Sequence, residues 1–170
     1  FNALLDAQNS GVEVTIVLDA GDNYFWSPYD MEMQYGLAAE LVNAGANVLW
    51  FSGSNSDPYL FIHSKVAVRD GQSVWMGSGN WKPSSMPLPD TWGNRDWGVI
   101  VDHTEFASDV LSQMQYDEDV SRQHIRQATA SDMPSEWNLP SQTTYNGTSA
   151  TEISGNFSGQ LITCPDNCIS

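Results

Sequence analysis

The sequence predicts an α/β domain built in layers, with a mixed β-sheet flanked by helices. Two observations carry this prediction. First, a strand-like apolar alternation, a helical pattern and a second short strand follow one another within residues 12–51. Second, a hairpin, one further strand and a covering helix come next in the chain. A chain of 170 residues is long enough to bury a core of this kind in a single domain.

The segment before the hairpin alternates between helix and strand patterns. Residues 1–9 are typical of the end of a helix, and residues 12–19 alternate apolar with other residues as a half-buried strand does. Ser27-Pro28-Tyr29-Asp30 has the features of a helix start: a Ser cap, Pro at the first helical position and an acid three residues after the cap. Gly45 marks the end of that helix, and residues 47–51 predict a short buried strand.

The segment after the hairpin predicts one loop, one strand and one helix. Residues 81–92 contain three prolines and no periodicity, which indicates a long loop. Residues 96–102 predict an apolar strand, and a helix capped by Thr104 follows. The periodicity fails beyond about Ala128. We therefore expect one domain over residues 1–127 and a Ser/Thr/Gly-rich irregular tail or linker over residues 128–170.

The most informative stretch is the hairpin itself. His63 and Lys65 lie two residues apart just before an apolar run, so on a strand both side chains point to one face. Asp70-Gly71 is a strong short-range signal for a two-residue hairpin turn. The hairpin therefore carries an imidazole and an ammonium group at its open end.

The second strand of the hairpin brings two neutral polar groups to the same place. Pairing around a turn at Asp70-Gly71 places Ser78 opposite His63, and cross-strand partners share a face. Asn80 then falls on that face as well, and moving the two-residue turn on by one residue preserves this arrangement. The four side chains together are suited to handling a phosphate group.

The spacing of these residues resembles the signature of the phospholipase D superfamily: H-x-K, four residues, Asp, six residues and then G-S-G-N. The resemblance extends more loosely over residues 1–127, which it identifies as a phospholipase D-like catalytic domain with one copy of the motif, and it does not cover the tail. The positions that fill the motif are His63, Lys65, Asp70, Gly77, Ser78 and Asn80.

The resemblance implies a phosphodiesterase that works through a covalent phosphohistidine and requires no metal or other cofactor. His63 is the expected nucleophile. Lys65 supplies a positive charge, and Ser78 and Asn80 supply neutral donors, for the non-bridging oxygens of a phosphodiester. Lys65, Asn80 and Trp81 are the residues expected to contact the substrate.

Other residues of the motif and its surroundings receive supporting roles. Asp70, Gly71 and Gly77 are expected to shape the hairpin. Only one ring nitrogen of the nucleophilic histidine attacks, and the other needs a hydrogen-bond acceptor. The superfamily usually supplies a Glu after the G-S-x-N element for this purpose. Asp96 is the candidate here, although it is one methylene shorter. Arg95 either forms a salt bridge with a surface acid or assists phosphate binding.

The mechanism needs a second histidine to protonate the leaving group, and the sequence contains no second H-x-K. His103 and His124 stand in other contexts, and we expect both to be structural. Two arrangements remain open. Either His63 of two chains faces across the axis of a homodimer, or a partner half with its own motif lies outside this sequence, which begins at Phe1 and has the character of an excised fragment.

The charge of the chain is strongly acidic. Asp and Glu number 21 against 6 Lys and Arg, which gives a net charge of −15. An acidic surface of this kind is typical of proteins from salty surroundings, and it opposes binding to a polyanion such as nucleic acid. No apolar run approaches the ~20 residues that a membrane-spanning helix needs.

The C-terminal tail points weakly to an exported protein, extracellular or at the cell surface. Cys164 and Cys168 are the only cysteines, and a small disulfide loop is the simplest interpretation because two thiolates alone make a poor zinc site. Asn146-Gly-Thr and Asn156-Phe-Ser match the pattern of glycosylation acceptors.

Three functions fit these observations. The first is a phosphodiesterase acting on phospholipid, which is slightly favoured because the Trp- and Pro-rich loop beside the site suits a lipid interface. The second is an endonuclease acting as a dimer, with the negative charge against it. The third is a non-catalytic binding module of a larger surface protein.

Four tryptophans near the motif have two possible roles, either rimming a groove for lipid or bases or packing in the core: Trp75, Trp81, Trp92 and Trp97.

Overall fold

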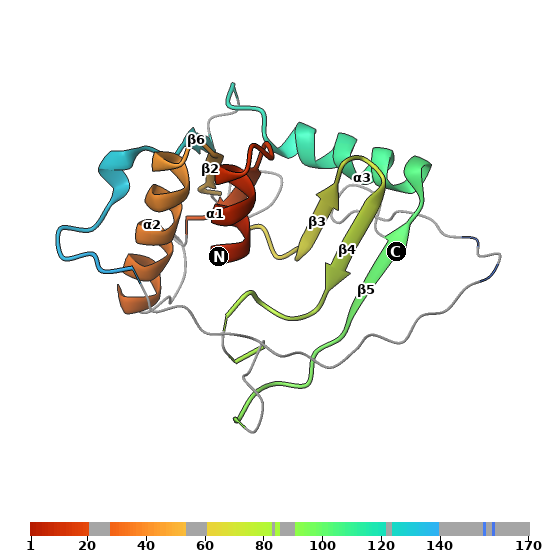
Figure 1. Ribbon diagram of the computed structural model, residues 1–170, viewed down its shortest axis with the longest axis horizontal. Helices are drawn as coiled ribbons and strands as arrows, with labels where there is room; N and C mark the ends of the chain where they lie inside the picture. The colour runs from red at the N-terminus through yellow and green to blue at the C-terminus, as the bar shows by residue number, and fades with distance from the viewer. Residues whose placement is uncertain are drawn as a thin grey trace. The chain divides into compact units, whose positions relative to one another are not determined.

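The computed structural model describes residues 1–20, 28–53, 61–82, 84–85, 91–121, 124–139, 155 and 158. Three α-helices and six strands lie in these ranges, which confirms the predicted α/β class (Figure 1). The strands form two three-stranded sheets rather than one. The chain also divides into two compact units, which we describe separately. Unit 1 contains Phe1–Ile62 and Glu118–Gln142, and unit 2 contains His63–Asp117.

The sheet of unit 1 is mixed. Strand β1 (Thr15–Asp19) pairs in parallel with β2 (Asn47–Phe51), and β2 pairs antiparallel with β6 (Ile125–Gln127). A parallel pair needs a long crossover, and α2 (Pro28–Asn43) supplies it. The shorter helix α1 (Asn2–Asn9) precedes β1 and packs beside α2.

The central strand β2 explains the core of unit 1. Its residues from Val48 to Phe51 are all buried, and they alternate between two clusters. Val48 and Trp50 pack with residues of α1 and α2, whereas Leu49 and Phe51 pack with Ile125 of β6. Burial on both faces is the reason that residues 47–51 read as a continuous apolar run.

Strand β1 begins three residues later than the alternation predicts. Val12 is 50 % exposed, and its backbone N–H donates to the carbonyl of Ala7 at the end of α1 (3.0 Å). Gly11, at φ +91°, makes the turn that leaves the helix. Val12 therefore belongs to the helix exit, and the strand starts at Thr15.

The residues beyond β6 continue to pack on unit 1. Strand β6 itself has only three residues, too few for a periodic signal, and the sequence did not predict it. The indole N–H of Trp137 donates to Glu40 of α2 (2.9 Å), and the same ring lies so close to Gly36 that a Cβ there would clash with it. The boundary expected after Gln127 stays a prediction.

A short 3-10 helix, η1 (Ala130–Asp132), ties this stretch to the buried strand. The carboxylate of Asp132 accepts the indole N–H of Trp50 (3.2 Å) and the backbone N–H of Thr129 (2.8 Å). It also pairs with Arg126 (3.1 Å), whose guanidinium lies 5.5 Å from the centre of the Trp50 ring. One carboxylate thus satisfies the buried indole and caps η1.

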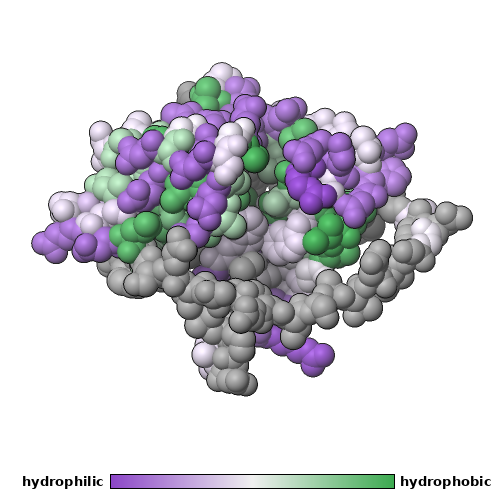
Figure 2. Space-filling view, in the orientation of Figure 1, coloured by the Kyte–Doolittle hydropathy of each residue, from purple (hydrophilic) through white to green (hydrophobic). Residues whose placement is uncertain are grey.

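Unit 2 is an antiparallel sheet covered on one face by a helix (Figure 1). The strands lie in the order β3 (Val66–Arg69), β4 (Ser73–Gly77) and β5 (Gly98–Asp102), and the helix is α3 (Thr104–Asp117). Val74 is fully buried between this helix and the sheet. On the face drawn in Figure 2, hydrophilic residues are interspersed with hydrophobic patches over the described surface.

The start of α3 differs from the prediction in its cap. The helix begins at Thr104, but the ring Nδ1 of His103 accepts the backbone N–H of Phe106 (3.2 Å) and so takes the capping position. His103 also donates its own backbone N–H to the carbonyl of Gln72 (3.0 Å). The preceding strand begins at Gly98 rather than at Asp96, because residues 96 and 97 bond through Ser78 instead of a strand ladder.

Several sequence predictions fall outside the described residues: the Ser27 cap, most of the loop that joins residues 81 and 92, the cysteine pair and the asparagines of both glycosylation triplets. Within the described ranges, none of the helices is both long and apolar enough to cross a bilayer.

We expect Asp132→Asn to destabilise unit 1 by about 1–2 kcal/mol at neutral pH, because it weakens a helix cap and a charged hydrogen-bond acceptor. Burial raises the pKa of Asp132, but hydrogen bonds from Thr129, Arg126 and Trp50 outweigh it, so the pKa lies below its ordinary value. The charged form therefore stabilises the fold above the unfolded pKa of about 3.9, and this stabilisation is lost as the pH falls through the folded pKa.

Urea denaturation of wild type and Asp132→Asn at a series of pH values tests this expectation. The difference in stability should shrink on acidification below about pH 4. Glu136→Gln, which removes an exposed acid from the same stretch, is the matched control and should change little. A difference that stays constant down to the lowest pH would contradict the assigned role of the carboxylate.

Candidate functional site

The turn of the β3–β4 hairpin is formed by the residues that the sequence indicates. Asp70 and Gly71 both have positive φ, +54° and +62°, as the central residues of a type I′ turn require. The backbone N–H of Gln72 donates to the carbonyl of Arg69 (2.9 Å) and closes the turn. Asp is one of the few residues other than Gly that tolerates this conformation, which accounts for Asp70 in the motif.

The register of the hairpin differs from the prediction by one residue. Arg69 pairs with Ser73, not with Gln72, so Gln72 is an extra residue on the second strand. The carbonyl of Gln72 accepts the backbone N–H of His103 (3.0 Å), one residue beyond the Ser73–Asp102 pair of β4 and β5. The predicted opposition of Ser78 to His63 is therefore wrong, because a one-residue shift moves every partner to the other face.

The open end of the hairpin follows the shifted register. The backbone N–H of Gly77 donates to the carbonyl of Lys65 (3.0 Å), so Lys65 stands beside Gly77. Lys65 Nζ turns back and donates to the carbonyl of His63 (2.5 Å). His63 is exposed and Lys65 is half-buried; both precede the first residue of β3. The backbone beyond the ladder, rather than the pleat of the sheet, positions these two residues.

Ser78 and Asp96 are joined directly. The Ser78 hydroxyl donates to Asp96 Oδ1 (2.8 Å) and accepts the backbone N–H of Trp97 (3.1 Å), while the Ser78 N–H donates to the Trp97 carbonyl (3.0 Å). A serine has only one O–H to donate. In this arrangement Ser78 therefore holds Asp96 and the start of β5, and its predicted donation to a phosphate oxygen requires that bond to open.

Two glycines of the motif allow this close packing. A Cβ at Gly79 would lie 3.0 Å from Cγ of Asp96, and a Cβ at Gly77 would lie 2.8 Å from the backbone oxygen of Trp97. Gly79 is buried. The expected structural role of Gly77 thus has a physical basis in the approach of β5, and Gly79 lets the Asp96 carboxylate approach the chain.

Lys65 and Asp96 interact electrostatically. Burial lowers the pKa of the Lys65 ammonium, and the negative charge of Asp96 acts in the opposite direction. Lys65, Ser78 and Asp96 thus form one cluster, next to His63 in sequence and within the same unit. The role of Asp96 as the acceptor for the ring of His63 stays a prediction.

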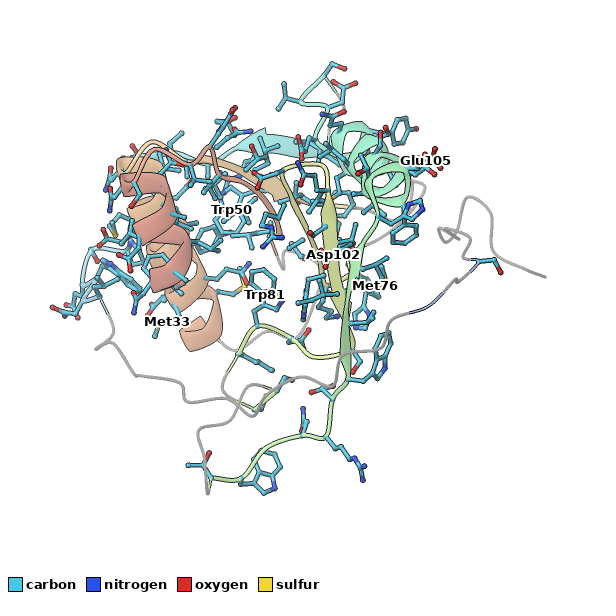
Figure 3. The ribbon with its side chains drawn as sticks, turned by 45° about the vertical axis from the view of Figure 1, so that its right-hand side comes forward. Met33, Trp50, Met76, Trp81, Asp102 and Glu105 are labelled. Atoms are coloured by element: carbon cyan, nitrogen blue, oxygen red, sulfur yellow. The ribbon has the colours of Figure 1, made fainter. Side chains whose placement is uncertain are left out.

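The remaining predicted residues lie around this cluster. Asn80 is half-buried, and its carbonyl accepts the N–H of Lys82 (2.8 Å). Trp81 follows on the segment that leaves β4 (Figure 3), is 52 % exposed and packs edge-on against Trp75 at 5.6 Å between ring centres. Arg95 is exposed and forms no ion pair with any residue that the structure describes, so the expected salt bridge is not found there.

The other two histidines are engaged elsewhere in the structure. His103 caps α3, as described above. His124 is buried in unit 1 and lies edge-on to Phe51. Both have the structural character that the sequence indicates.

One contact that the sequence did not predict lies within unit 1, at the last residue before His63. The carboxylate of Asp19, at the end of β1, accepts the backbone N–H of Ile62 (2.9 Å), the residue immediately before His63. Ile62 also packs on the Leu49 and Phe51 side of the core of unit 1. The only signal in the sequence is an Asp that ends an apolar strand, and it does not by itself reveal a partner 43 residues away.

The chain matches the family model described as "Cardiolipin synthase, PLD-like domain" over residues 1–118. It belongs to this family. The phospholipase D-like domain, predicted from the spacing of the motif, is thereby confirmed, and domains of this family are generally phosphodiesterases. None of the curated proteins matches the chain. The matched region includes every residue of the cluster and ends one residue beyond α3.

We expect Gly77→Ala to destabilise unit 2 by about 1–3 kcal/mol, because the new Cβ forces the backbone of β5 away from β4. Denaturation monitored by circular dichroism measures the change. Gly79→Ala is the matched control: its nearest neighbour is a side chain, Asp96, which can turn aside, so the loss should be smaller. Equal stability of Gly77→Ala and wild type would show that the two strands do not approach so closely.

Proposed function

We propose that this PLD-like domain cleaves phosphodiester bonds through a covalent phosphohistidine at His63. One ring nitrogen of His63 attacks the phosphorus, the bond to the leaving oxygen breaks, and an acid protonates that oxygen. Water then attacks the phosphohistidine and regenerates the imidazole. The observation that carries the proposal is the Lys65–Asp96–Ser78 cluster beside His63, within a chain that belongs to a phosphodiesterase family.

Each residue of the cluster has a place in this scheme. Lys65 offsets the negative charge on the non-bridging oxygens, and Asn80 donates a hydrogen bond to the same group. Asp96 holds the His63 ring in the correct tautomer. Ser78 acts by positioning Asp96, to which its hydroxyl is bonded. No step of the scheme calls for a metal ion.

The acid and general base of the scheme come from a second copy of the motif. His103 and His124 are engaged in capping and packing, which supports a source outside the described chain. We propose a homodimer in which His63 of each chain serves the same site; a partner half carrying its own motif is the alternative. An extracellular or cell-surface location, which the cysteine pair and the glycosylation triplets favour, is part of the proposal.

Phospholipid is the substrate class that we favour over nucleic acid. A nucleic-acid strand presents many phosphates, and a chain with a net charge of −15 repels it. A single lipid phosphodiester presents only one phosphate, so the net charge of the chain repels it less. A nuclease needs a basic face, and the basic residues of the segment from His63 to Asp117 number only four: Lys65, Arg69, Lys82 and Arg95.

The test is turnover of a generic aryl phosphodiester by the full chain in the presence of EDTA. His63→Ala should lower the rate at least about 10³-fold, since it removes the nucleophile. Lys65→Ala should also cause a large loss. Ser64→Ala, an exposed residue between the two, is the matched control and should leave the rate close to that of wild type.

Two further results decide the details. A phosphoenzyme trapped from wild type and absent from His63→Ala supports the covalent intermediate, whereas turnover by His63→Ala rules His63 out as the nucleophile. A sizing column run on the active protein tests the homodimer: an active monomer excludes the shared site. Binding of a phosphodiester without any turnover, unchanged in His63→Ala, would favour a binding module instead.

A further inference from the structure

Two segments of unit 2 form one tied rim next to the cluster. We define the aromatic rim as residues 81–82, 84–85 and 91–97. The backbone N–H of Asn94 donates to the carbonyl of Ser84 (2.5 Å), and the Asn94 amide donates to the Ser85 hydroxyl (3.4 Å). Ser85 in turn donates its N–H to the carbonyl of Lys82 (3.0 Å). The two parts of the rim are therefore held together by hydrogen bonds.

The rim is continuous with the residues that carry the proposed chemistry. Trp97 bonds Ser78 through both its N–H and its carbonyl, and Trp81 directly follows Asn80. The Trp97 end of the rim therefore adjoins the Ser78–Asp96 pair. The connection is covalent and hydrogen-bonded within one unit.

The side chains of the rim are unusual for a protein surface. Trp81, Trp92 and Trp97 are 52 %, 82 % and 64 % exposed. Tryptophan is among the side chains with most to gain from leaving water, so three exposed indoles on one tied structure indicate a surface that meets a partner. Lys82 and Arg95 are exposed between them, in a chain that has only six basic residues.

Alternation of indoles and cations suits the headgroup region of a bilayer. An indole has an apolar body and a polar N–H, and it settles where acyl chains meet headgroups. Lysine and arginine can lay their stems along apolar surface and hold the charge at the level of the lipid phosphates. Two exposed cations are few for an extended nucleic acid, where several phosphates must be neutralised against the net charge of the chain.

We propose that the aromatic rim docks onto the surface of a zwitterionic phospholipid bilayer and so presents a lipid phosphodiester to His63 and Lys65. A zwitterionic surface has no net charge, and the overall charge of −15 does not oppose it. This inference rests on the proposed function, because it names the form in which that site meets its substrate. The docking itself does not require the chemistry.

Binding of the full chain to phosphatidylcholine vesicles, measured by co-sedimentation, tests the docking. The inactive variant His63→Ala serves as the starting protein, so that turnover cannot change the lipid. Adding Trp92→Ala together with Trp97→Ala should weaken binding at least about tenfold, because two indoles no longer enter the interface. Tyr116→Ala is the matched control: Tyr116 is a 58 % exposed aromatic residue of α3 outside the rim, and its loss should change binding little.

The single variant Trp92→Ala controls for misfolding, since an 82 % exposed side chain contributes little to the core. It should show part of the loss of vesicle binding seen in the double variant. Vesicles with brominated acyl chains should quench the tryptophan fluorescence of the unaltered rim more than that of the double variant. Raising the salt concentration should weaken binding only slightly. Equal binding by the rim variants and the Tyr116→Ala control would overturn the proposal.

The remaining outcomes separate the docking from the proposed function. Turnover of the soluble aryl phosphodiester without vesicle binding overturns the docking and leaves the function standing. Vesicle binding without turnover of any phosphodiester overturns the proposed function and leaves the docking standing. Binding to a single-stranded oligonucleotide in place of vesicles, with steep salt dependence, assigns the rim to nucleic acid, and a dimer that the rim variants dissociate assigns it to a second copy of the chain; both overturn the bilayer.

Discussion

The hydrogen bond between Ser78 and Asp96 is the constraint on which the candidate site depends. It lies just beyond the last strand pair, Gly77 with Gly98, and with the bonds from Ser78 to Trp97 it extends the β4–β5 pairing past the end of the ladder. The carboxylate is then held against Gly79 and within reach of the charge on Lys65. Partial burial lowers the pKa of the Lys65 ammonium, and the nearby negative charge of Asp96 acts in the opposite direction.

The extra residue in the hairpin decides how the motif is presented. With two turn residues only, the pleat would place Ser78 on the face of His63; with Gln72 inserted, the pleat no longer does so. The functional side chains instead lie on the irregular backbone at the strand ends, where neighbouring bonds set their directions. This explains why the cluster forms through Asp96, on a separate segment, rather than through pairs facing each other across the hairpin.

The parts of the structure that the sequence predicts well are those with a local cause. Asp70-Gly71 demands a left-handed turn, Gly45 ends a helix, and residues 47–51 are apolar because both faces are buried. The parts that escaped prediction depend on distant partners. The bulge at Gln72 is held by the backbone of His103, and β6 exists because β2 offers it an edge. Such bonds leave no periodic trace in either segment.

The local distribution of charge, more than the net charge of the chain, determines how a small anion interacts with it. Exposed charges are screened over a Debye length of about 8 Å at physiological ionic strength, so a small anion responds to its immediate neighbours. The segment from His63 to Asp117 contains four of the six basic residues but only seven of the 21 acids. The basic residues of this segment include Lys65, beside Asp96 at the open end of the hairpin, and Lys82 and Arg95 on the adjoining rim. A long polyanion extends over many Debye lengths and meets the acidic remainder of the chain as well, so the net charge of −15 opposes a polyanion more strongly than it opposes one small anion.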